Sequence, residues 1–199
     1  MGQAEGPTRA ERTRARLLEA AVQTFSERGF HGTTTRDIAT ASGLSSAALY
    51  VHHKSKEELL FEISKAGHEE TLEIVTAAVA STDQVVEQFR ALVRGYVLFH
   101  VRKHTMARVI NYEMAALSPD HLAEIKQIRR RIDRVIYGLV RAGVTAGVFD
   151  TPDSRMTAVV LESMGIDIAR WYCDHGNWTP AQIANRYVDM ALRLVGFRP

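Results

Sequence analysis

Small, hydroxyl-bearing and aromatic side chains follow one another in a short stretch that begins at Ser45 and ends at Tyr50. If this stretch is a helix, Ser45, Ser46, Ala47 and Tyr50 face outward. Small side chains let a helix sit deep in the major groove of DNA, and hydroxyl groups can hydrogen-bond to base edges or phosphates. A tyrosine can donate to a phosphate or contact the methyl group of thymine. The stretch therefore has the chemistry to read duplex DNA.

The residues before this stretch complete a helix-turn-helix arrangement. Residues 35 to 41 suit its first helix, Gly43 suits the left-handed position of a turn, and the second helix opens at Ser45. The small core between the two helices would consist of Ile38, Ala39, Leu44 and Leu49. A helical hairpin that merely packs has the same spacing, so the turn and the spacing alone leave both interpretations open.

Two histidines, His100 and His104, are four residues apart and would share one face of a helix, a spacing that can bind a metal ion. No third ligand is identifiable, so we expect both to face solvent near a helix end and assign no metal. Cys173 and His175 complete no metal motif either. The sequence has no phosphate-binding loop, dinucleotide glycine pattern, His-Glu-x-x-His or nucleophile elbow. We expect no cofactor, no catalytic residues and no enzymatic activity.

Helix start signals recur along the chain. Capping-box spacings, in which a hydroxyl precedes an acidic or amide side chain by three residues, begin at Thr8, Thr34, Ser55 and Thr179. Proline at the first helical position adds starts at Ser118-Pro119 and Thr151-Pro152. Apolar residues between these signals keep a helical period, and strand signals are nearly absent. The chain is predicted to be all-α.

The expected helices are short before Ser55 and long after it. This difference predicts two domains: residues 1–54, a three-helix helix-turn-helix DNA-binding domain, and residues 55–199, a helical-bundle domain for ligand binding and dimerisation. No Gly/Ser-rich linker separates them. The helix that begins at Lys56 should therefore belong to both domains and couple them rigidly.

The 199 residues carry a net charge of +2, which is too small to indicate a nucleic-acid partner by itself. Its distribution is more informative, because residues 1 to 56 hold eight Arg and Lys against five Asp and Glu. A single cysteine excludes a disulfide framework, and no apolar run is long enough for a signal peptide or a membrane helix. We expect a protein of the reducing cytoplasm with no membrane partner.

A longer string of residues carries a family resemblance. It comprises residues 20–21, 25–30, 32–39, 42–45, 49–50 and 55–60, and it closely resembles the N-terminal domain of TetR-family transcriptional regulators. This resemblance and the groove chemistry above give the candidate DNA-contacting residues Thr34, Thr35, Arg36, Ser45, Ser46, Ala47, Tyr50, His52 and Lys56. By the family's pattern, Lys56 meets a phosphate, and the helix starts at Thr35 and Lys56 also offer backbone N–H groups to phosphates.

The string departs from the family's pattern at two positions. Ala47 stands where glycine is common, which should alter the close contact with the groove. His53 stands where phenylalanine is usual. This histidine would either loosen the core under Tyr50 or add a pH-sensitive contact with a phosphate.

The second domain resembles the family more loosely. Arg170-Trp171-Tyr172 followed by Thr179-Pro180-Ala181-Gln182 looks like the branch that responds to acyl-coenzyme A thioesters. A regulator that responds to a ligand needs a cavity between converging helices, in which the ligand binds. The candidate lining residues of this cavity are Tyr96, Phe99, Met106, Ile110, Glu113, Glu162, Ile166 and Arg170. The apolar members equally suit plain bundle core. Because carboxylates are costly inside a bundle, we expect Arg108 and Arg170 as partners of Glu113, Glu162 and Asp167.

The last two helices, about residues 152–172 and 180–195, carry apolar stripes that by the family's pattern form a four-helix interface in a homodimer. These features predict a repressor that a small hydrophobic effector, such as an acyl-CoA thioester, releases from a double-stranded DNA operator. Acidic residues in the cavity would disfavour an anionic thioester, so a neutral or cationic hydrophobic ligand, as in a drug-responsive efflux regulator, is the alternative. A helical ligand-binding or scaffolding protein without DNA binding is a third interpretation.

Overall fold

The computed structural model describes residue 6 and residues 8–198, and within these residues the chain is helical and has no β-strand, so the all-α prediction is confirmed. The elements are α1 (Arg9–Arg28), α2 (Thr35–Ala41), α3 (Ser46–His52), α4 (Lys56–Ala80), α5 (Val85–Arg102), α6 (His104–Tyr112), the 3-10 turn η1 (Met114–Ala116), α7 (Pro119–Thr145), α8 (Ser154–Trp171) and α9 (Pro180–Leu194). Among the described residues, no helix combines the length and the apolar composition that a membrane span requires.

Side-chain caps determine where most of the helices begin. Thr8, Thr34 and Thr179 each form the reciprocal capping box that the sequence predicts, and Ser55 and Ser118 cap α4 and α7. The predicted start at Thr151-Pro152 is wrong. Asp153 Oδ1 accepts from the N–H groups of Arg155 and Met156, both at 2.9 Å, so α8 begins two residues later than the proline signal indicates. A carboxylate at a helix N-terminus is a favourable cap because it also faces the positive end of the helix dipole.

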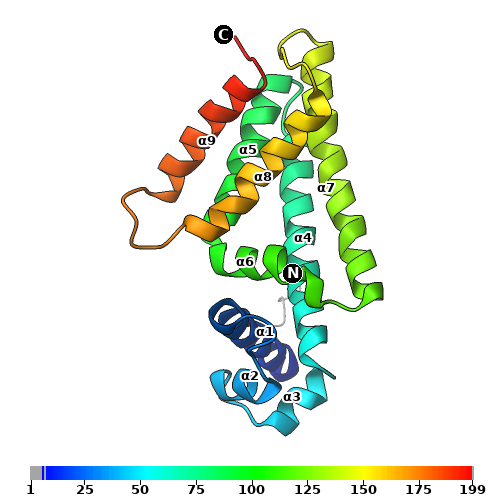
Figure 1. The fold of residues 1–199 in the computed structure, drawn as a ribbon, viewed down its shortest axis with the longest axis vertical. Helices are drawn as coiled ribbons and strands as arrows, with labels where there is room; N and C mark the ends of the chain where they lie inside the picture. The colour runs from blue at the N-terminus through cyan, green and yellow to red at the C-terminus, as the bar shows by residue number, and fades with distance from the viewer. Residues whose placement is uncertain (1–5, 7, 199) are drawn as a thin grey trace.

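Helices α1 to α3 form a unit that we call the head, the lower part of Figure 1. Its core contains Leu17, Phe25, Ile38 and Leu49, which are fully buried. Gly43 has a φ of 67° in the turn between α2 and α3, a backbone conformation that glycine adopts without strain. The packing of α2 against both α1 and α3 gives the head the helix-turn-helix arrangement that the sequence predicts.

Helices α4 to α9 form a second unit that we call the body. Figure 1 shows α4 running upward from the head into the body, where it packs against α5 and α7. Helix α8 crosses α5, α6 and α7, and α9 packs on α5 at the edge of the bundle. At Gly165 of α8 an added Cβ would lie 2.2 Å from the ring of Tyr96, so only glycine allows α8 to come this close to α5.

Candidate DNA-contacting head and effector cavity

Helix α3 presents the surface expected to contact DNA and buries its opposite side. Ser45 caps the helix by accepting from the N–H of Ala48 at 3.1 Å, and Leu49 is fully buried. Tyr50 is 54 % exposed, and Ala47, one turn earlier on the same side, is also exposed. The cap and the buried leucine fix the orientation of α3, so Tyr50 points away from the core without any packing role.

Helix α2 contributes the second part of this surface. The Thr35 hydroxyl lies 3.1 Å from the Tyr50 hydroxyl, and Arg36 is exposed next to it. Thr34 is used differently, because its hydroxyl donates to Asp37 Oδ2 at 2.6 Å and accepts from the N–H of Asp37. Of the remaining predicted residues, Ser46 and His52 are half-buried on α3. The structure thus brings Thr35, Arg36 and Tyr50 together, whereas Thr34 serves mainly as a helix cap.

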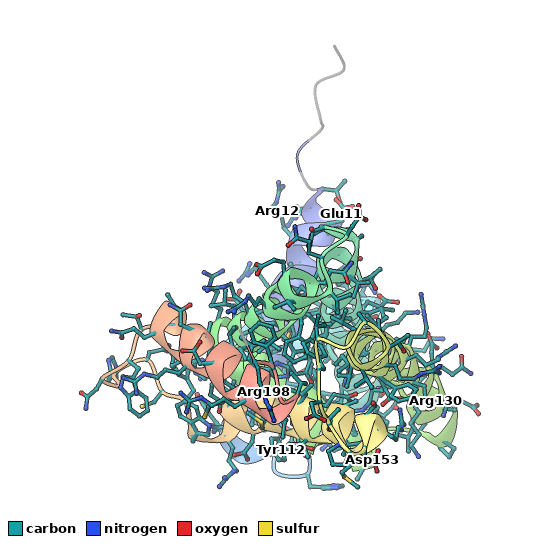
Figure 2. The ribbon with its side chains drawn as sticks, turned by 90° about the horizontal axis from the view of Figure 1, so that it is seen from above. Glu11, Arg12, Tyr112, Arg130, Asp153 and Arg198 are labelled. Carbon is teal, nitrogen blue, oxygen red and sulfur yellow. The ribbon has the colours of Figure 1, made fainter. Side chains whose placement is uncertain are left out.

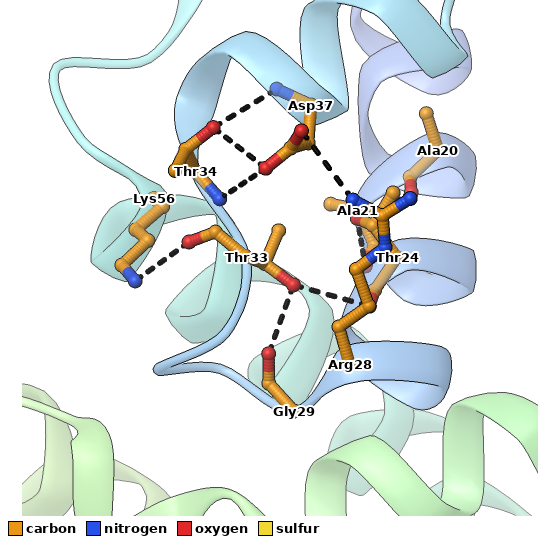
Figure 3. Close-up of polar contacts among 9 residues, drawn as sticks. All are labelled: Ala20, Ala21, Thr24, Arg28, Gly29, Thr33, Thr34, Asp37 and Lys56. Atoms are coloured by element: carbon orange, nitrogen blue, oxygen red, sulfur yellow. Dashed lines mark hydrogen bonds and ion pairs between the residues drawn. The ribbon is translucent and has the colours of Figure 1, made fainter.

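The side chain of Lys56, which the family resemblance places at a phosphate, is bonded within the protein in this structure. Its Nζ donates to the carbonyl oxygens of Phe30 and Thr33, both at 2.7 Å, and lies 4.3 Å from the centre of the Phe30 ring. Figure 3 shows Thr33 between Lys56 and Gly29, with its hydroxyl donating to the Gly29 carbonyl at 2.8 Å. The ammonium group therefore ties the turn between α1 and α2 to the start of α4.

His53 does not make the contact with a phosphate that was one of the two roles expected of it. Its side chain is buried, with only 1 % of the residue exposed, and its Nε2 donates to Glu62 Oε2 at 3.0 Å. The same carboxylate accepts from Arg14 Nε at 3.1 Å and lies 2.7 Å from Arg14 Nη2. Because Arg14 is on α1, His53 ends α3 and Glu62 is on α4, this contact joins three elements of the head and body. The other ring nitrogen of His53, Nδ1, is buried without a hydrogen-bond partner among the described residues.

Glu57, the next residue after Lys56, joins α4 to the start of α7. Its Oε1 accepts from the N–H of Ser118 at 2.8 Å and from His121 Nδ1 at 2.9 Å, and the His121 ring stacks on Phe61 with 3.8 Å between ring centres. Burial raises the pKa of the Glu57 carboxyl, but the bonds from Ser118 and His121 outweigh it, so the pKa lies below its ordinary value. The first turn of α4 thus contacts the head on one side and α7 on the other.

We expect Glu57→Gln to lower stability at neutral pH, because it removes the charge from a half-buried acceptor of two hydrogen bonds. The loss should be about 1.5–3 kcal/mol in the free energy of unfolding. Since the folded pKa of Glu57 is lowered, this contribution is full above the unfolded pKa of about 4.3 and is lost as pH falls through the folded value. Urea unfolding of both proteins from neutral to acid pH measures it, with exposed Glu69→Gln on the same helix as control. A difference between Glu57→Gln and the parent that is as large below the folded pKa of Glu57 as at neutral pH would contradict this assignment.

A small cavity lies in the body, between α4, α5, α6, α7 and α8. It is lined by His68, Thr71, Tyr96, His100, Ile110, Asn111, Arg129, Ile132, Glu162 and Ile166. Its volume of about 20 Å³ has room for roughly one water molecule. A larger effector would need the surrounding helices to move apart.

Four predicted lining residues, Tyr96, Ile110, Glu162 and Ile166, line this cavity, and the structure places the other four elsewhere. Phe99 packs its ring edge-on against His100 in the core, and Met106 is half-buried on α6. Glu113 lies at the end of α6, next to Gly29 of the head. Arg170 is exposed and pairs with Asp167 at 2.6 Å, as expected for that carboxylate. Arg108, the other expected partner, donates to the Ala169 carbonyl.

His68 and His100 are the cavity residues whose role the sequence concealed. The expectation that His100 faces solvent is wrong, since it is 2 % exposed. Burial lowers the pKa of each imidazole to about 4, so both are neutral near pH 7. His104, the partner in the expected pair, is half-buried and packs against Tyr172. Within the part of the chain that the structure describes, no three His, Cys, Asp or Glu side chains form a metal-binding group.

An exposed apolar face covers the end of α8 and most of α9. A hollow of about 460 Å³ on this face is lined by Trp171, Trp178, Ile183, Arg186, Tyr187, Asp189, Met190 and Arg193. Met190 is 45 % and Trp178 49 % exposed. Figure 2 shows α9 and the loop before it on the side of the molecule opposite to Arg130 of α7. Large exposed apolar patches with a polar rim are typical of protein–protein interfaces.

Comparison with known families matches both units. Residues 17–63 match the description "Bacterial regulatory proteins, tetR family", and residues 82–195 match "Tetracyclin repressor-like, C-terminal domain". The chain belongs to the TetR family of transcriptional regulators. The resemblance expected from the residues between Phe25 and Leu60 is confirmed, and with it the helix-turn-helix class of the head.

Individual TetR-family proteins are similar over nearly the whole chain. The HTH-type transcriptional repressor KstR2 of Mycobacterium tuberculosis is 28 % identical over 185 residues, 90 % of each chain. A crystal structure of a tetR-family regulatory protein from Rhodococcus RHA1 is 39 % identical, with a TM-score of 0.89 over 97 % of this chain and 100 % of the other. The crystal structure of AibR in complex with isovaleryl coenzyme A and operator DNA is 27 % identical, with a TM-score of 0.83 over 94 % of this chain and 100 % of the other.

Proposed function

We propose that this TetR-family protein is a homodimeric repressor in the cytoplasm that leaves its operator when a small, largely hydrophobic molecule enters the cavity of the body. Residues 1–54 bind DNA, and residues 55–199 bind the effector and the second copy. The observation that carries the proposal is the position of α4, which begins against the head at Lys56 and lines the cavity at His68 and Thr71. A ligand that separates the helices around the cavity therefore displaces the helix that holds the head.

An acyl-CoA thioester is the effector class that the relatives favour. AibR carries isovaleryl coenzyme A in one of the similar structures, and KstR2 is named as a repressor. The apolar lining of Ile110, Ile132 and Ile166 suits an acyl chain. An organic cation, the alternative for a drug-responsive regulator, would meet the charge of Arg129 in the same cavity.

Tyr50→Ala tests the DNA-binding part of the proposal. Because Tyr50 is half-exposed and packs no core, the variant should melt within about 2 °C of the parent. Its affinity for the operator should fall about tenfold to hundredfold, the cost of a lost contact to DNA. A gel shift with the DNA upstream of the protein's own gene, repeated at several salt concentrations, measures it.

Tyr112→Ala is the matched control, because Tyr112 is 49 % exposed at the end of α6 in the body. It removes the same side chain from a surface that we do not assign to DNA, and its operator affinity should equal that of the parent. If Tyr50→Ala binds the operator as tightly as Tyr112→Ala, Tyr50 does not contact DNA.

A further inference from the structure

Arg129 is a cation at the cavity without a carboxylate partner. Its Nη1 donates to His68 Nε2 and to Asn111 Oδ1, both at 3.0 Å. Among residues 8–198 no Asp or Glu oxygen lies within ion-pair distance of its guanidinium, and its Nε and Nη2 have no acceptor. Other arginines of the body, such as Arg155 and Arg170, pair with aspartates. Arg129 is thus held in place by neutral groups, with one side of its guanidinium unused.

The two acceptors around Arg129 are neutral for a structural reason. His68 Nδ1 lies 2.7 Å from the Ser64 carbonyl oxygen, which can only accept, so Nδ1 carries the proton. The other ring nitrogen of His68, Nε2, accepts from Arg129, which can only donate, so Nε2 is unprotonated. His100 is fixed in the same way by the Tyr96 carbonyl at 2.8 Å. Neither histidine therefore adds to or cancels the charge of Arg129.

Glu162, the acidic residue of the lining, compensates this charge only in part. Its Oε1 is buried without a hydrogen-bond partner among the described residues. Burial, and next the negative charge of Asp133, raise the pKa of the Glu162 carboxyl to about 7, although Arg129 opposes the shift. Asp133 itself is paired with Arg155 at 2.7 Å. The cavity thus holds one full positive charge and a carboxyl whose pKa is raised toward neutral pH.

We propose that Arg129 binds a carboxylate group of the effector, with the aliphatic part of the same molecule against Ile110, Ile132 and Ile166. The inference rests on the proposed effector function and narrows the ligand to an aliphatic carboxylate. The planar edge formed by Nε and Nη2 matches the two oxygens of a carboxylate. Arg129 is half-buried, and a cation that is partly removed from water without a counter-ion is unfavourable. A ligand that supplies the opposite charge should therefore bind more strongly than a neutral molecule of equal shape.

The carboxylate can come from a free fatty acid or from the far end of an acyl-CoA whose chain carries a second carboxyl group. Two pairs of probes separate these sources: hexanoate against hexanamide, and adipoyl-CoA against hexanoyl-CoA. Within each pair only one member presents the carboxylate. The parent protein should bind the carboxylate member of at least one pair about tenfold to hundredfold more tightly, as measured by calorimetry. The pair whose members differ in affinity shows whether the carboxylate belongs to a free fatty acid or to the acyl chain of an acyl-CoA.

Arg129→Gln should abolish this preference and leave the affinity for the neutral member nearly unchanged. The ratio of affinities within a pair does not depend on stability, so it remains valid if the variant melts earlier. Arg131→Gln, an exposed arginine two residues away on α7, is the matched control and should keep the preference. Equal affinities within both pairs for the parent protein, a preference retained by Arg129→Gln, or no binding of any of the four probes would each overturn the carboxylate assignment.

Proton linkage provides a second readout. Glu162 is faced by Arg129 and Asp133 of α7, Arg155 of α8, His68 of α4, and Tyr96 and His100 of α5. Ionised Glu162 repels an anionic ligand, so the preference should weaken as the pH rises from about 6 to about 8, and Glu162→Gln should remove this dependence. If the parent protein prefers the carboxylate probe equally at every pH, Glu162 does not face the bound carboxylate as proposed. Operator binding without any probe tests the proposed function separately, so failure of the carboxylate assignment leaves that function standing.

Discussion

The Met190→Glu variant is expected to be monomeric and to lose about 100-fold to 10,000-fold in operator affinity, the range by which linking two binding modules raises affinity. Met190 is 45 % exposed in the apolar hollow on α9. In a homodimer with two-fold symmetry the same patch occurs on both copies. The substitution therefore buries two carboxylates among apolar groups, one from each copy. One head alone contacts only half of a two-fold operator. Light scattering at micromolar protein and a gel shift measure the two losses.

Val144→Glu is the matched control for this prediction. Val144 is 37 % exposed in the last turn of α7 and does not line the hollow on α9, and the substitution introduces the same charge. This variant should remain a dimer with the operator affinity of the parent. If Met190→Glu also remains a dimer, the apolar face of α8 and α9 is not the interface between copies of this chain.

Features that depend on a few neighbouring residues could be predicted from the sequence. The hydroxyls of Thr8, Thr34 and Thr179 cap helices because the acceptor and the donor are three residues apart, a distance that the sequence displays directly. Gly43 and the apolar spacing around it similarly predict the turn between α2 and α3. The start of α8 was misplaced because two local signals compete there, and the carboxylate of Asp153 prevails over the proline.

The cavity could be predicted only in part, because its residues come from five helices. Arg129 stands in a run of three arginines that is typical of a solvated helix surface, yet His68, 61 positions earlier, turns it toward the cavity. The four-residue spacing of His100 and His104 predicts a pair of histidines on the protein surface. Its carbonyl partner at Tyr96 satisfies one ring nitrogen internally, and burial then keeps the imidazole neutral. No local sequence pattern predicts the bond between Arg129 and His68 or the burial of His100.

The head shows the same limit at His53. Its neighbours in the sequence are exposed or half-buried residues of α3 and the following turn, and the family's usual phenylalanine predicts only that the site is apolar. The partner that makes a histidine acceptable there is Glu62 of α4, which is also paired with Arg14 of α1. Glu62 satisfies Nε2 of this buried ring, whereas Nδ1 is buried without a hydrogen-bond partner among the described residues.

Lys56→Met is expected to lower the free energy of unfolding by about 3 kcal/mol, because two hydrogen bonds from a charged donor disappear and two carbonyl oxygens lose their partner. For a chain of this size the melting temperature should fall by roughly 6–12 °C. Methionine keeps the length of the aliphatic side chain over the Phe30 ring, so the variant removes the ammonium group with little change in packing. Calorimetric melting measures the loss.

The salt dependence of operator binding separates this internal role from the phosphate contact that the family's pattern implies. Each phosphate contact contributes about 0.9 to the slope of log affinity against log salt concentration. In the parent, the Lys56 ammonium donates to Phe30 and Thr33. If this is its role, it contacts no phosphate, and the folded Lys56→Met protein keeps the salt slope of the parent. Lys54→Met, which removes an exposed lysine nearby, should melt like the parent. A Lys56→Met protein that melts like the parent but has a shallower slope would show that Lys56 turns outward to DNA.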